Sequence, residues 1–275
     1  MSDVPKDTEP QTDLSPPKPA SEGVKNISAV QGVSDAPPLA PADNSLPAPS
    51  PPTEDTKPKA REVPRQPDTL PDGTPVMKIG DVDKFRELNH PQGQAVPGFK
   101  GTCGECSTEC VLRQFGVDTT EADVVNLASA NGWCITDSTP EYNGGTSPDD
   151  RAKILTAKGI PSSVEQGKNL DDLAKYVEDG RGVILATNAG HLWNDPDALG
   201  DDPSKPNHAV TLIGVARGAK TGEPVGVYIN DSGNYDGGAG SGKFIDAKTM
   251  TKAWVQAGGE CTVTDVSYLI SKDEG

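Results

Sequence analysis

Hydrophobic positions recur with two different periods along this chain, and the change falls near residue 180. Between residues 103 and 178, apolar and small side chains recur every three to four positions, which is typical of amphipathic helices. Together with Gly, Ser, Thr and Asn at the ends, this pattern predicts helices at 103–115, 120–130, 148–158 and 170–178. Beyond residue 180, β-branched runs bounded by Gly, Asp, Asn and Pro predict strands at 182–187, 208–216, 225–230 and 261–270, with a further helix at 247–256. Helices followed by an antiparallel sheet predict an α+β fold.

The first 75 residues have a different composition. They contain 17 of the 26 prolines and no aromatic residue, and the first aromatic side chain is Phe85. Such a segment buries too little apolar surface to offset the entropy lost on folding. We therefore predict a disordered, proline-rich acidic linker over residues 1–75 and one folded domain over residues 76–275. Within that domain, residues 76–100 are expected to form an irregular lead-in with a short helical piece near 82–88.

Charge and hydropathy exclude several kinds of partner. The formal net charge of −16 argues against nucleic acid and against an anionic membrane, because phosphate contacts need clustered Lys and Arg. No apolar run reaches 18 residues, so no membrane span is predicted. The segment Met1–Pro5 lacks a basic region and an apolar stretch, so no secretory signal peptide is predicted and any export would need another route. Five cysteines without such a signal favour free thiols over a disulfide framework.

Three residues carry the candidate chemistry. Cys103 begins the first predicted helix, where the helix dipole and the free backbone N–H groups favour a thiolate. His208 begins a predicted strand, and its imidazole can take the thiol proton and later donate it to a leaving group. Asp231 follows the next strand and can accept from the other imidazole nitrogen, which fixes the tautomer. Side chains alternate along a strand, so only one of Asn230 and Asp231 can face the imidazole, and we favour Asp231. This set implies no metal and no organic cofactor.

Other interpretations of the same residues stay open. Cys103, Cys106 and Cys110 share one helical face and suggest a metal or iron–sulfur site, although no second Cys/His pair supplies the remaining ligand. The candidate cysteine and histidine can also be ordinary core residues, and the candidate aspartate can serve only a turn. His191 is an alternative base.

Several short motifs follow one another in a fixed order over about residues 101–265. They are Cys-Gly at 103–104, Leu112, Gly116, Thr-Glu-Ala-Asp-Val-Val at 120–125, Gly-Gly-Thr at 144–146, His-Ala-Val at 208–210, Gly214 and Asp231. In this order and spacing the chain resembles papain-like cysteine peptidases. The resemblance extends to the branch that trims bacteriocin leader peptides and to related bacterial toxin and effector domains.

The resemblance implies a papain-like fold in which the helix that carries the nucleophile packs on the antiparallel sheet. It implies that Cys103 attacks a peptide carbonyl, that His208 acts as base and then acid, and that Asp231 orients His208. The substrate would be a protein or peptide. The toxin-type relatives further imply a bacterial effector that leaves the producing cell by a specialised secretion system. Such an effector would act in the cytoplasm of a target cell and be neutralised by a cognate immunity protein.

Two departures from the family pattern leave alternatives. Papain-type enzymes carry a glutamine about six residues before the nucleophile as a donor to the oxyanion. Here Pro97 stands at that place, and Gln94 and Gln92 lie nine and eleven residues upstream. Either the loop is longer, or backbone N–H groups serve alone. The second departure is that a papain-type Cys-Gly-x-Cys register would make Cys106 the nucleophile, whereas the leader-peptidase register favours Cys103.

The chemistry also leaves alternatives. Glutamine deamidases and transglutaminases use the same thioester intermediate on the same fold. A catalytically inert peptide-binding module is the third hypothesis, and the missing upstream glutamine is the observation that favours it.

Overall fold

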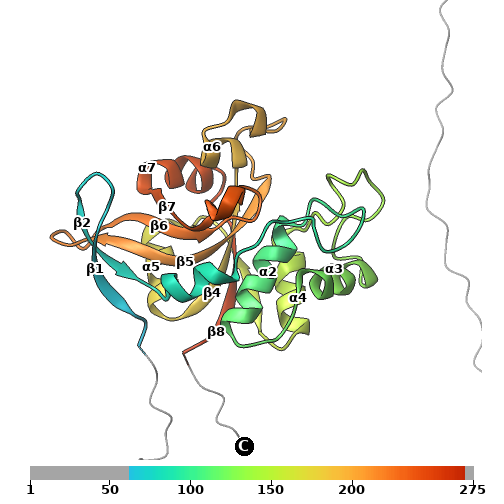
Figure 1. Cartoon of the computed structure of the whole chain (residues 1–275), viewed down its shortest axis with the longest axis horizontal. Coiled ribbons are helices and arrows are strands. Elements are labelled where there is room, and N and C mark those ends of the chain that lie inside the picture. Colours follow the sequence, from blue (N-terminus) through green and yellow to red (C-terminus); the bar gives the residue numbers. More distant parts are fainter. Residues whose placement is uncertain (1–61, 270–275) are drawn as a thin grey trace, which may run out of the picture. The chain divides into compact units, whose positions relative to one another are not determined.

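The computed structural model describes residues 62–269 (Figure 1). The predicted linker up to position 61 lies outside the described residues, as do residues 270–275. The described part combines helices with one eight-stranded antiparallel sheet, which confirms the predicted α+β class. Among the described helices, none has the length and apolar character to cross a membrane.

The sheet is organised around one long central strand. The strands are β1 (Arg65–Thr69), β2 (Pro75–Ile79), β3 (Ser162–Glu165), β4 (Arg181–Thr187), β5 (His208–Gly218), β6 (Pro224–Asn230), β7 (Ser241–Asp246) and β8 (Cys261–Ser267). They pair in the order β1-β2-β5-β4-β8-β3, and β6 pairs with both β5 and β7. Along one edge of β5, residues 208–212 pair with β4 and residues 215–218 with β2, while β6 pairs along the other edge. The beginning of β5 therefore lies between β4 and the end of β6.

Most helices begin where the sequence predicts. They are α1 (Val82–Phe85), α2 (Cys103–Gln114), α3 (Glu121–Ala130), α4 (Pro148–Ala157), α5 (Leu170–Glu178), α6 (Ala189–Trp193) and α7 (Ala247–Met250). The N-caps of α3, α4 and α5 are Thr120, Ser147 and Asn169, and each forms a reciprocal capping box with an aspartate three residues later. The last predicted helix is α7 followed by a π-helical turn over Thr251–Val255.

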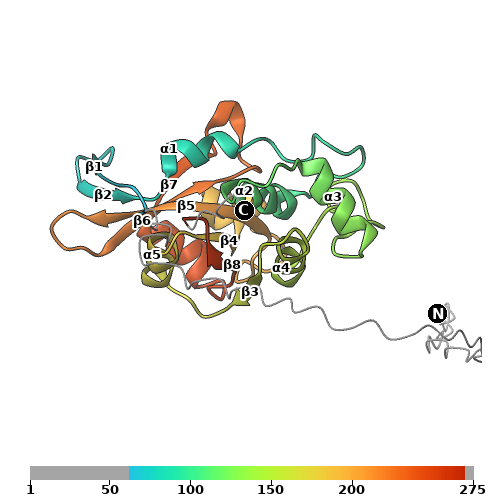
Figure 2. The same cartoon turned by 90° about the horizontal axis from the view of Figure 1, so that it is seen from below.

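The helices cover both faces of the sheet. Alternate side chains of β4 point to opposite faces, so Ile184 packs among residues of α2, α3 and α4, whereas Val183 and Leu185 pack among residues of α5, α7 and the π-helical turn. Trp254 is fully buried on the second face. In both cartoon views the β1–β2 hairpin lies at one end of this part of the chain, and α3 and α4 lie toward the other (Figures 1 and 2).

The structure differs from the sequence expectation at the start of this part. The hairpin β1–β2 begins at Arg65, and β2 extends the sheet through pairs such as Ile79 with Val215. Regular structure therefore begins before residue 76. Every residue of β1 is exposed, and the strand contains Pro67 and polar neighbours, so it has no apolar alternation that a sequence pattern could reveal.

Short strands were also missed. The structure adds β3 and β7, which are four and six residues long, and half-buried rather than apolar. The glycine-rich stretch 237–242 is hydrogen-bonded to the end of β6. Asp231 donates its backbone N–H to Gly240, and Gly242 donates to the Oδ1 of Asn230.

Candidate active site

The structure places Cys103 at the first position of α2, beside a cavity of about 440 Å³. Its side chain is half-buried and lines the cavity. Gly104 follows it, and a Cβ at this position would lie 1.9 Å from the Oγ1 of Thr146. The glycine therefore lets the segment before α4 pack closely on the beginning of α2.

His208 and Asp231 form a buried hydrogen-bonded pair next to this thiol. His208 begins β5, and Asp231 directly follows β6. The antiparallel pairing of Thr211 with Asn230 brings these two strand ends together. The Nε2 of His208 lies 2.8 Å from the Oδ1 of Asp231, and their side chains are 5% and 0% exposed. Because Nε2 is engaged by the carboxylate, Nδ1 is the ring nitrogen that remains for Cys103.

The alternation of side chains at the end of β6 separates two candidate partners. Asn230 turns away from the imidazole: its Nδ2 donates to the carbonyl of Phe85 at 2.8 Å. Asp231 turns toward the imidazole, and its Oδ1 also accepts the backbone N–H groups of Gly233 and Asn234 at 3.0 and 3.1 Å. The carboxylate is thus fixed from several directions.

Two further residues that the sequence did not connect with this pair support it. The Nε1 of Trp193 donates to the Oδ2 of Asp231 at 2.7 Å, and the indole ring meets the ring of His208 edge-on, with centroids 5.1 Å apart. Gly233 leaves room for the imidazole, since a Cβ there would lie 2.7 Å from the Cε1 of His208. No spacing rule links these positions to the pair. The alternative base, His191, lines a different cavity.

The electrostatic environment favours a thiolate on Cys103. Burial raises the pKa of Cys103, but the hydrogen bond with His208, the charge of His208, the N–H of Ala209 and the charge of Arg151 together hold it below its ordinary value. Burial lowers the pKa of His208, but its hydrogen bonds and charge interactions with Asp231 and Cys103 raise it to about 10. These shifts favour the thiolate form of Cys103 and the imidazolium form of His208.

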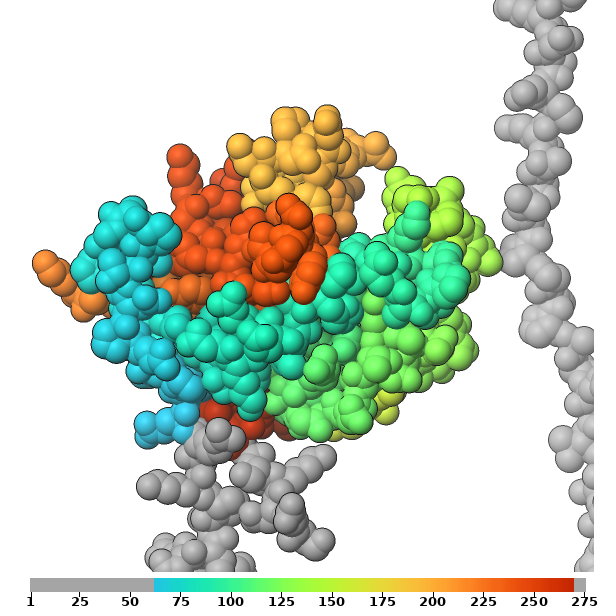
Figure 3. Space-filling view, in the orientation of Figure 1, coloured from blue at the N-terminus to red at the C-terminus, as the bar shows by residue number. Residues whose placement is uncertain are grey.

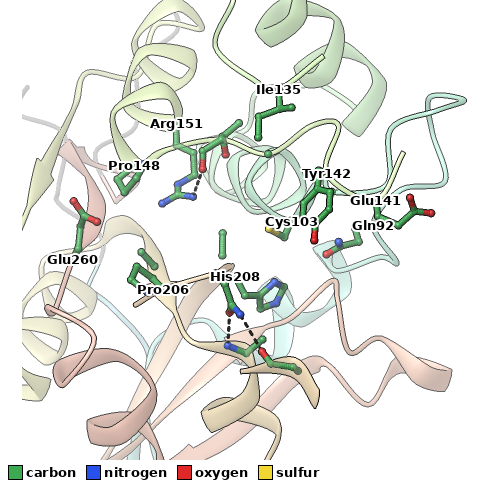
Figure 4. Close-up of a pocket in the computed structure, with 18 of the residues that line it drawn as sticks. Gln92, Cys103, Ile135, Glu141, Tyr142, Pro148, Arg151, Pro206, His208 and Glu260 are labelled. Atoms are coloured by element: carbon green, nitrogen blue, oxygen red, sulfur yellow. Dashed lines mark hydrogen bonds between the residues drawn. The ribbon is translucent and has the colours of Figure 1, made fainter. Parts of the chain in front are cut away.

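Gln92 reaches the same cavity from the loop before α2. Its Nε2 donates to the carbonyl of Lys100 at 3.0 Å, and its Oε1 accepts from the Oγ of Ser232 at 3.2 Å. Figure 4 shows Cys103 and His208 near the centre of the cavity, with Gln92 on one side and Arg151 on the other. Of the two upstream glutamines, Gln92 lines the cavity and Gln94 does not.

The three thiols that the metal hypothesis grouped are separated. Cys103 faces the cavity, and Cys110 is buried and lies 3.3 Å from the carbonyl of Leu88. Within residues 62–269, one group of side chains has donor atoms close enough to hold a metal ion: those of Cys106, His90 and Glu121 lie within 4.8 Å of one another. All five cysteines are free.

Hydrogen bonds within the protein already occupy histidine and carboxylate atoms of this group that could bind a metal ion. The Nε2 of His90 lies 2.6 Å from the Oε2 of Glu109, and the Oε1 of Glu121 accepts from Thr102 at 2.5 Å and from the N–H of Gly93 at 2.9 Å.

The rim of the cavity comes from two segments far apart in the sequence. One includes Ile135 and Tyr142, which are 47% and 66% exposed, and the other includes Ala198 and Pro206. Figure 3 shows these segments as separate projections with a hollow between them. Exposed apolar side chains beside a cavity are typical of a surface that contacts a ligand.

Comparisons with known proteins assign the class. A family model described as the Peptidase_C39-like family matches residues 79–262, about two thirds of the chain, so the chain belongs to this family. This confirms the predicted class, a papain-like peptidase of the cysteine type. One similar solved structure is of a protein described as a C39-like peptidase from Bacillus anthracis. It is 17% identical, covers 65% of this chain and 94% of that chain, and gives a TM-score of 0.45. No match was found among curated proteins.

Proposed function

We propose that this chain is a cysteine peptidase in which Cys103 is the nucleophile, His208 the base and acid, and Asp231 the residue that positions His208. The observation that carries the proposal is that Cys103 and His208 line one cavity, with Asp231 hydrogen-bonded to His208 and the pKa of the thiol lowered. Cys106 is less suited to this role because it is 2% exposed and burial raises its pKa well above the ordinary value.

In the proposed reaction the thiolate of Cys103 attacks the scissile carbonyl carbon and forms a tetrahedral oxyanion. His208 then gives its Nδ1 proton to the leaving amine, the C–N bond breaks, and a thioester remains. Neutral His208 next removes a proton from a water molecule, which attacks the thioester and releases the carboxylic acid. Asp231 stays ionised throughout and holds the imidazole orientation through Nε2.

The oxyanion has two candidate donors. One is the backbone N–H of Cys103 at the beginning of α2, and the other is the side-chain amide of Gln92. The position of Gln92 supports the longer-loop alternative over backbone donors alone. Replacing it by alanine is expected to lower kcat by about 10²-fold, as the loss of one oxyanion donor does elsewhere.

The first experiment is alkylation of the full chain with iodoacetamide across pH, with the modified cysteine mapped by peptide mass. It is run beside hydrolysis of a mixed peptide library by the wild type, Cys103→Ala and His208→Ala. Rapid labelling of Cys103 alone, together with hydrolysis that both substitutions abolish, is the expected result. If Cys106 is labelled first, the nucleophile is Cys106 and not Cys103. If no cysteine is labelled faster than a free cysteine, the proposal is overturned.

The same library separates peptidase from the related chemistries. Both reactions proceed through a thioester at the cysteine, so only their products distinguish them. Peptide hydrolysis divides a peptide into two fragments, whereas deamidation of a glutamine adds about one dalton to an intact peptide. An inert binding module would give neither product and would keep its peptide binding after Cys103→Ala. The position of Gln92 at the cavity supports the peptidase over an inert module.

We further propose, from the resemblance of the short motifs alone, that the peptidase is an antagonistic bacterial effector of the toxin-type branch. It would be exported by a specialised route, act in the cytoplasm of a target cell and be blocked by an immunity protein. Expression of the wild type and of Cys103→Ala in a bacterial cytoplasm tests this. Growth arrest by the wild type alone is expected, and equal growth of both cultures would contradict the effector role.

A further inference from the structure

Arg151 is a buried cation in the wall of the candidate active site. It lies in the first turn of α4, is 3% exposed and lines the same cavity as Cys103 and His208 (Figure 4). Among the residues that line this cavity, all of them within the described part of the chain, it is the single lysine or arginine. The remainder of that wall offers no other permanent positive charge.

One edge of this guanidinium has no partner. Its Nη1 donates to the carbonyl of Thr146 at 3.3 Å, while Nε and Nη2 are buried without a hydrogen bond. Nε and Nη2 present two parallel N–H bonds, the arrangement that matches the two oxygens of a carboxylate. Buried donors in folded proteins are nearly always bonded, so the unpaired edge of this cavity-lining side chain calls for a partner, either water or an incoming group.

Neighbouring carboxyl groups do not fill this edge. Within residues 62–269, no carboxylate lies within ion-pair distance of Arg151. Glu260 lies on the same cavity, but its Oε1 accepts from Gln166 at 2.8 Å. Glu105 is fully buried, and burial raises the pKa of its carboxyl well above the ordinary value, which makes it a poor counter-ion for Arg151.

The surroundings hold Arg151 in place. Thr146 accepts from its Nη1 and is itself packed against Gly104, where a Cβ would lie 3.4 Å from the Cδ of Arg151 as well. The guanidinium is thus supported on one side by the beginning of α2, next to the candidate nucleophile. A cation fixed in this way loses little side-chain entropy when it binds an anion.

We propose that Arg151 forms a subsite for a carboxylate of the peptide substrate, so that the enzyme selects cleavage sites beside an acidic side chain or a free C-terminus. This inference rests on the proposed peptidase function and adds a substrate class to it. The charge of the whole chain points the other way, since a net charge of −16 would favour basic peptides over acidic ones. Selectivity for a carboxylate would therefore arise from this one local contact.

The test begins with the cleavage profile of the full chain on peptides from a tryptic digest of bacterial cytosolic protein. The digest is used with free C-termini and again after amidation of the C-termini. Enrichment of Asp and Glu at one position in both forms would identify a side-chain carboxylate, and cleavage only of the free-acid form would identify the C-terminal carboxylate. No enrichment of either kind would overturn the proposal.

A matched pair of peptides then isolates Arg151. The best substrate is compared with its amide isostere, Glu replaced by Gln or the free acid by the amide, and the ratio of the two kcat/KM values is the readout. We expect a ratio of at least about tenfold for the wild type, a ratio near one for Arg151→Met, and an intermediate ratio for Arg151→Lys, which keeps the charge and loses the fork.

The ratio of the two kcat/KM values separates a loss of carboxylate selectivity from a general loss of activity. Arg151 also helps to lower the pKa of Cys103, so Arg151→Met slows both peptides, but only a lost subsite changes their ratio. Lys153→Met is the matched control on the same helix, because its ammonium pairs with Asp150 outside the cavity and its loss leaves the ratio unchanged. An unchanged ratio in Arg151→Met would overturn the proposal.

Binding to Cys103→Ala distinguishes this inference from the peptidase proposal. The probes are the acetylated, amidated pentapeptides Ala-Ala-Glu-Ala-Ala and Ala-Ala-Gln-Ala-Ala and the free-acid form of the second, measured by titration calorimetry. A carboxylate preference without any hydrolysis by the wild type would end the peptidase proposal and keep the subsite. Hydrolysis without a carboxylate preference would do the reverse.

Discussion

Helix α2 carries two cysteines one turn apart, and each lies near a histidine and a carboxyl group. Cys103 lies beside His208, which Asp231 holds, and Cys106 lies beside His90 and Glu121. The pKa of Cys103 lies below its ordinary value, whereas that of Cys106 lies well above it. A cysteine, a histidine and a carboxylate in proximity are thus not sufficient for a nucleophile.

The difference lies in what each thiol faces. The hydrogen bond and charge of His208, the N–H of Ala209 and the charge of Arg151 together lower the pKa of Cys103 by more than its burial raises it. Burial dominates at Cys106, and the negative charges of Glu121 and Glu109 add to it. The imidazole of His90 is hydrogen-bonded to Glu109, which raises the pKa of that histidine but leaves it no role toward the thiol. We therefore expect Cys103, with positive charges beside it, to react before Cys106, which is buried and beside negative charges.

The largest expected effect is the loss of the thiol at the cavity. Cys103→Ala is expected to lower peptide hydrolysis by about 10⁴-fold or more, because nothing else can form the thioester. Cys106→Ala removes a small buried side chain and is expected to change kcat by less than about threefold. Hydrolysis rates and thermal midpoints of both variants are measured side by side. Loss of hydrolysis in a folded Cys106→Ala protein would reverse the comparison.

The second effect concerns the two carboxyl groups that contact the histidines. Asp231→Asn is expected to lower kcat by about 10²- to 10⁴-fold, because the amide no longer holds the imidazolium and can select the wrong tautomer. Glu109→Gln changes the other histidine–carboxylate pair and is expected to alter stability with little change in kcat. Steady-state kinetics and denaturant unfolding of both proteins measure this, and equal losses of kcat would contradict it.

The pH dependence is expected to separate the two thiols. Because the pKa of Cys103 is lowered, its alkylation should reach half its maximum at a lower pH than that of an ordinary cysteine. Because the pKa of Cys106 is raised well above 9.0, it should stay unlabelled through that range. Hydrolysis should fall again as pH passes about 10, where His208 loses the proton that the leaving amine needs.

His208→Ala is the control for that profile. It removes the charge and the hydrogen bond that lower the pKa of Cys103, so the alkylation curve should move toward higher pH. A curve that does not move would show that the imidazole is not the cause.

The smallest expected effect is that of Trp193, whose indole contacts the pair His208 and Asp231. Trp193→Phe keeps the ring against His208 but removes the donor to Asp231, and we expect kcat to fall about tenfold, the value of one hydrogen bond to a charged group. Since Trp193 lowers the pKa of Asp231, the acid limb of the pH–rate profile should move upward. A fall in stability with an unchanged pH profile would reduce Trp193 to a packing residue.

The sequence predicts those parts of the molecule that depend on local signals. The N-caps Thr120, Ser147 and Asn169 place three helices within a residue, and the β-branched run after His208 places the central strand. By contrast, β1 has no apolar pattern, because its residues are exposed and it joins the sheet through backbone pairing with β2.

The residues of the candidate site also include some that a local pattern predicts and some that only tertiary packing brings there. The alternation along β6 predicts that either Asn230 or Asp231 faces the imidazole, and the structure turns Asp231 toward it. The contacts of Trp193 and the position of Gln92 depend on loops that fold back over the sheet, so no local pattern predicts them. Arg151 looks like an ordinary helix-surface residue in the sequence, and its burial arises only when α4 packs beside α2.

The two halves of the candidate site belong to different layers and are made at different times. Cys103 stands in the helical layer, while His208 and Asp231 stand on strands synthesised more than a hundred residues later. The strand β8, which lies between β4 and β3, comes last among the described strands. During synthesis Cys103 therefore lacks the imidazole and the carboxylate until β5 and β6 have been made and paired. In the proposed mechanism, peptidase activity begins only at that stage.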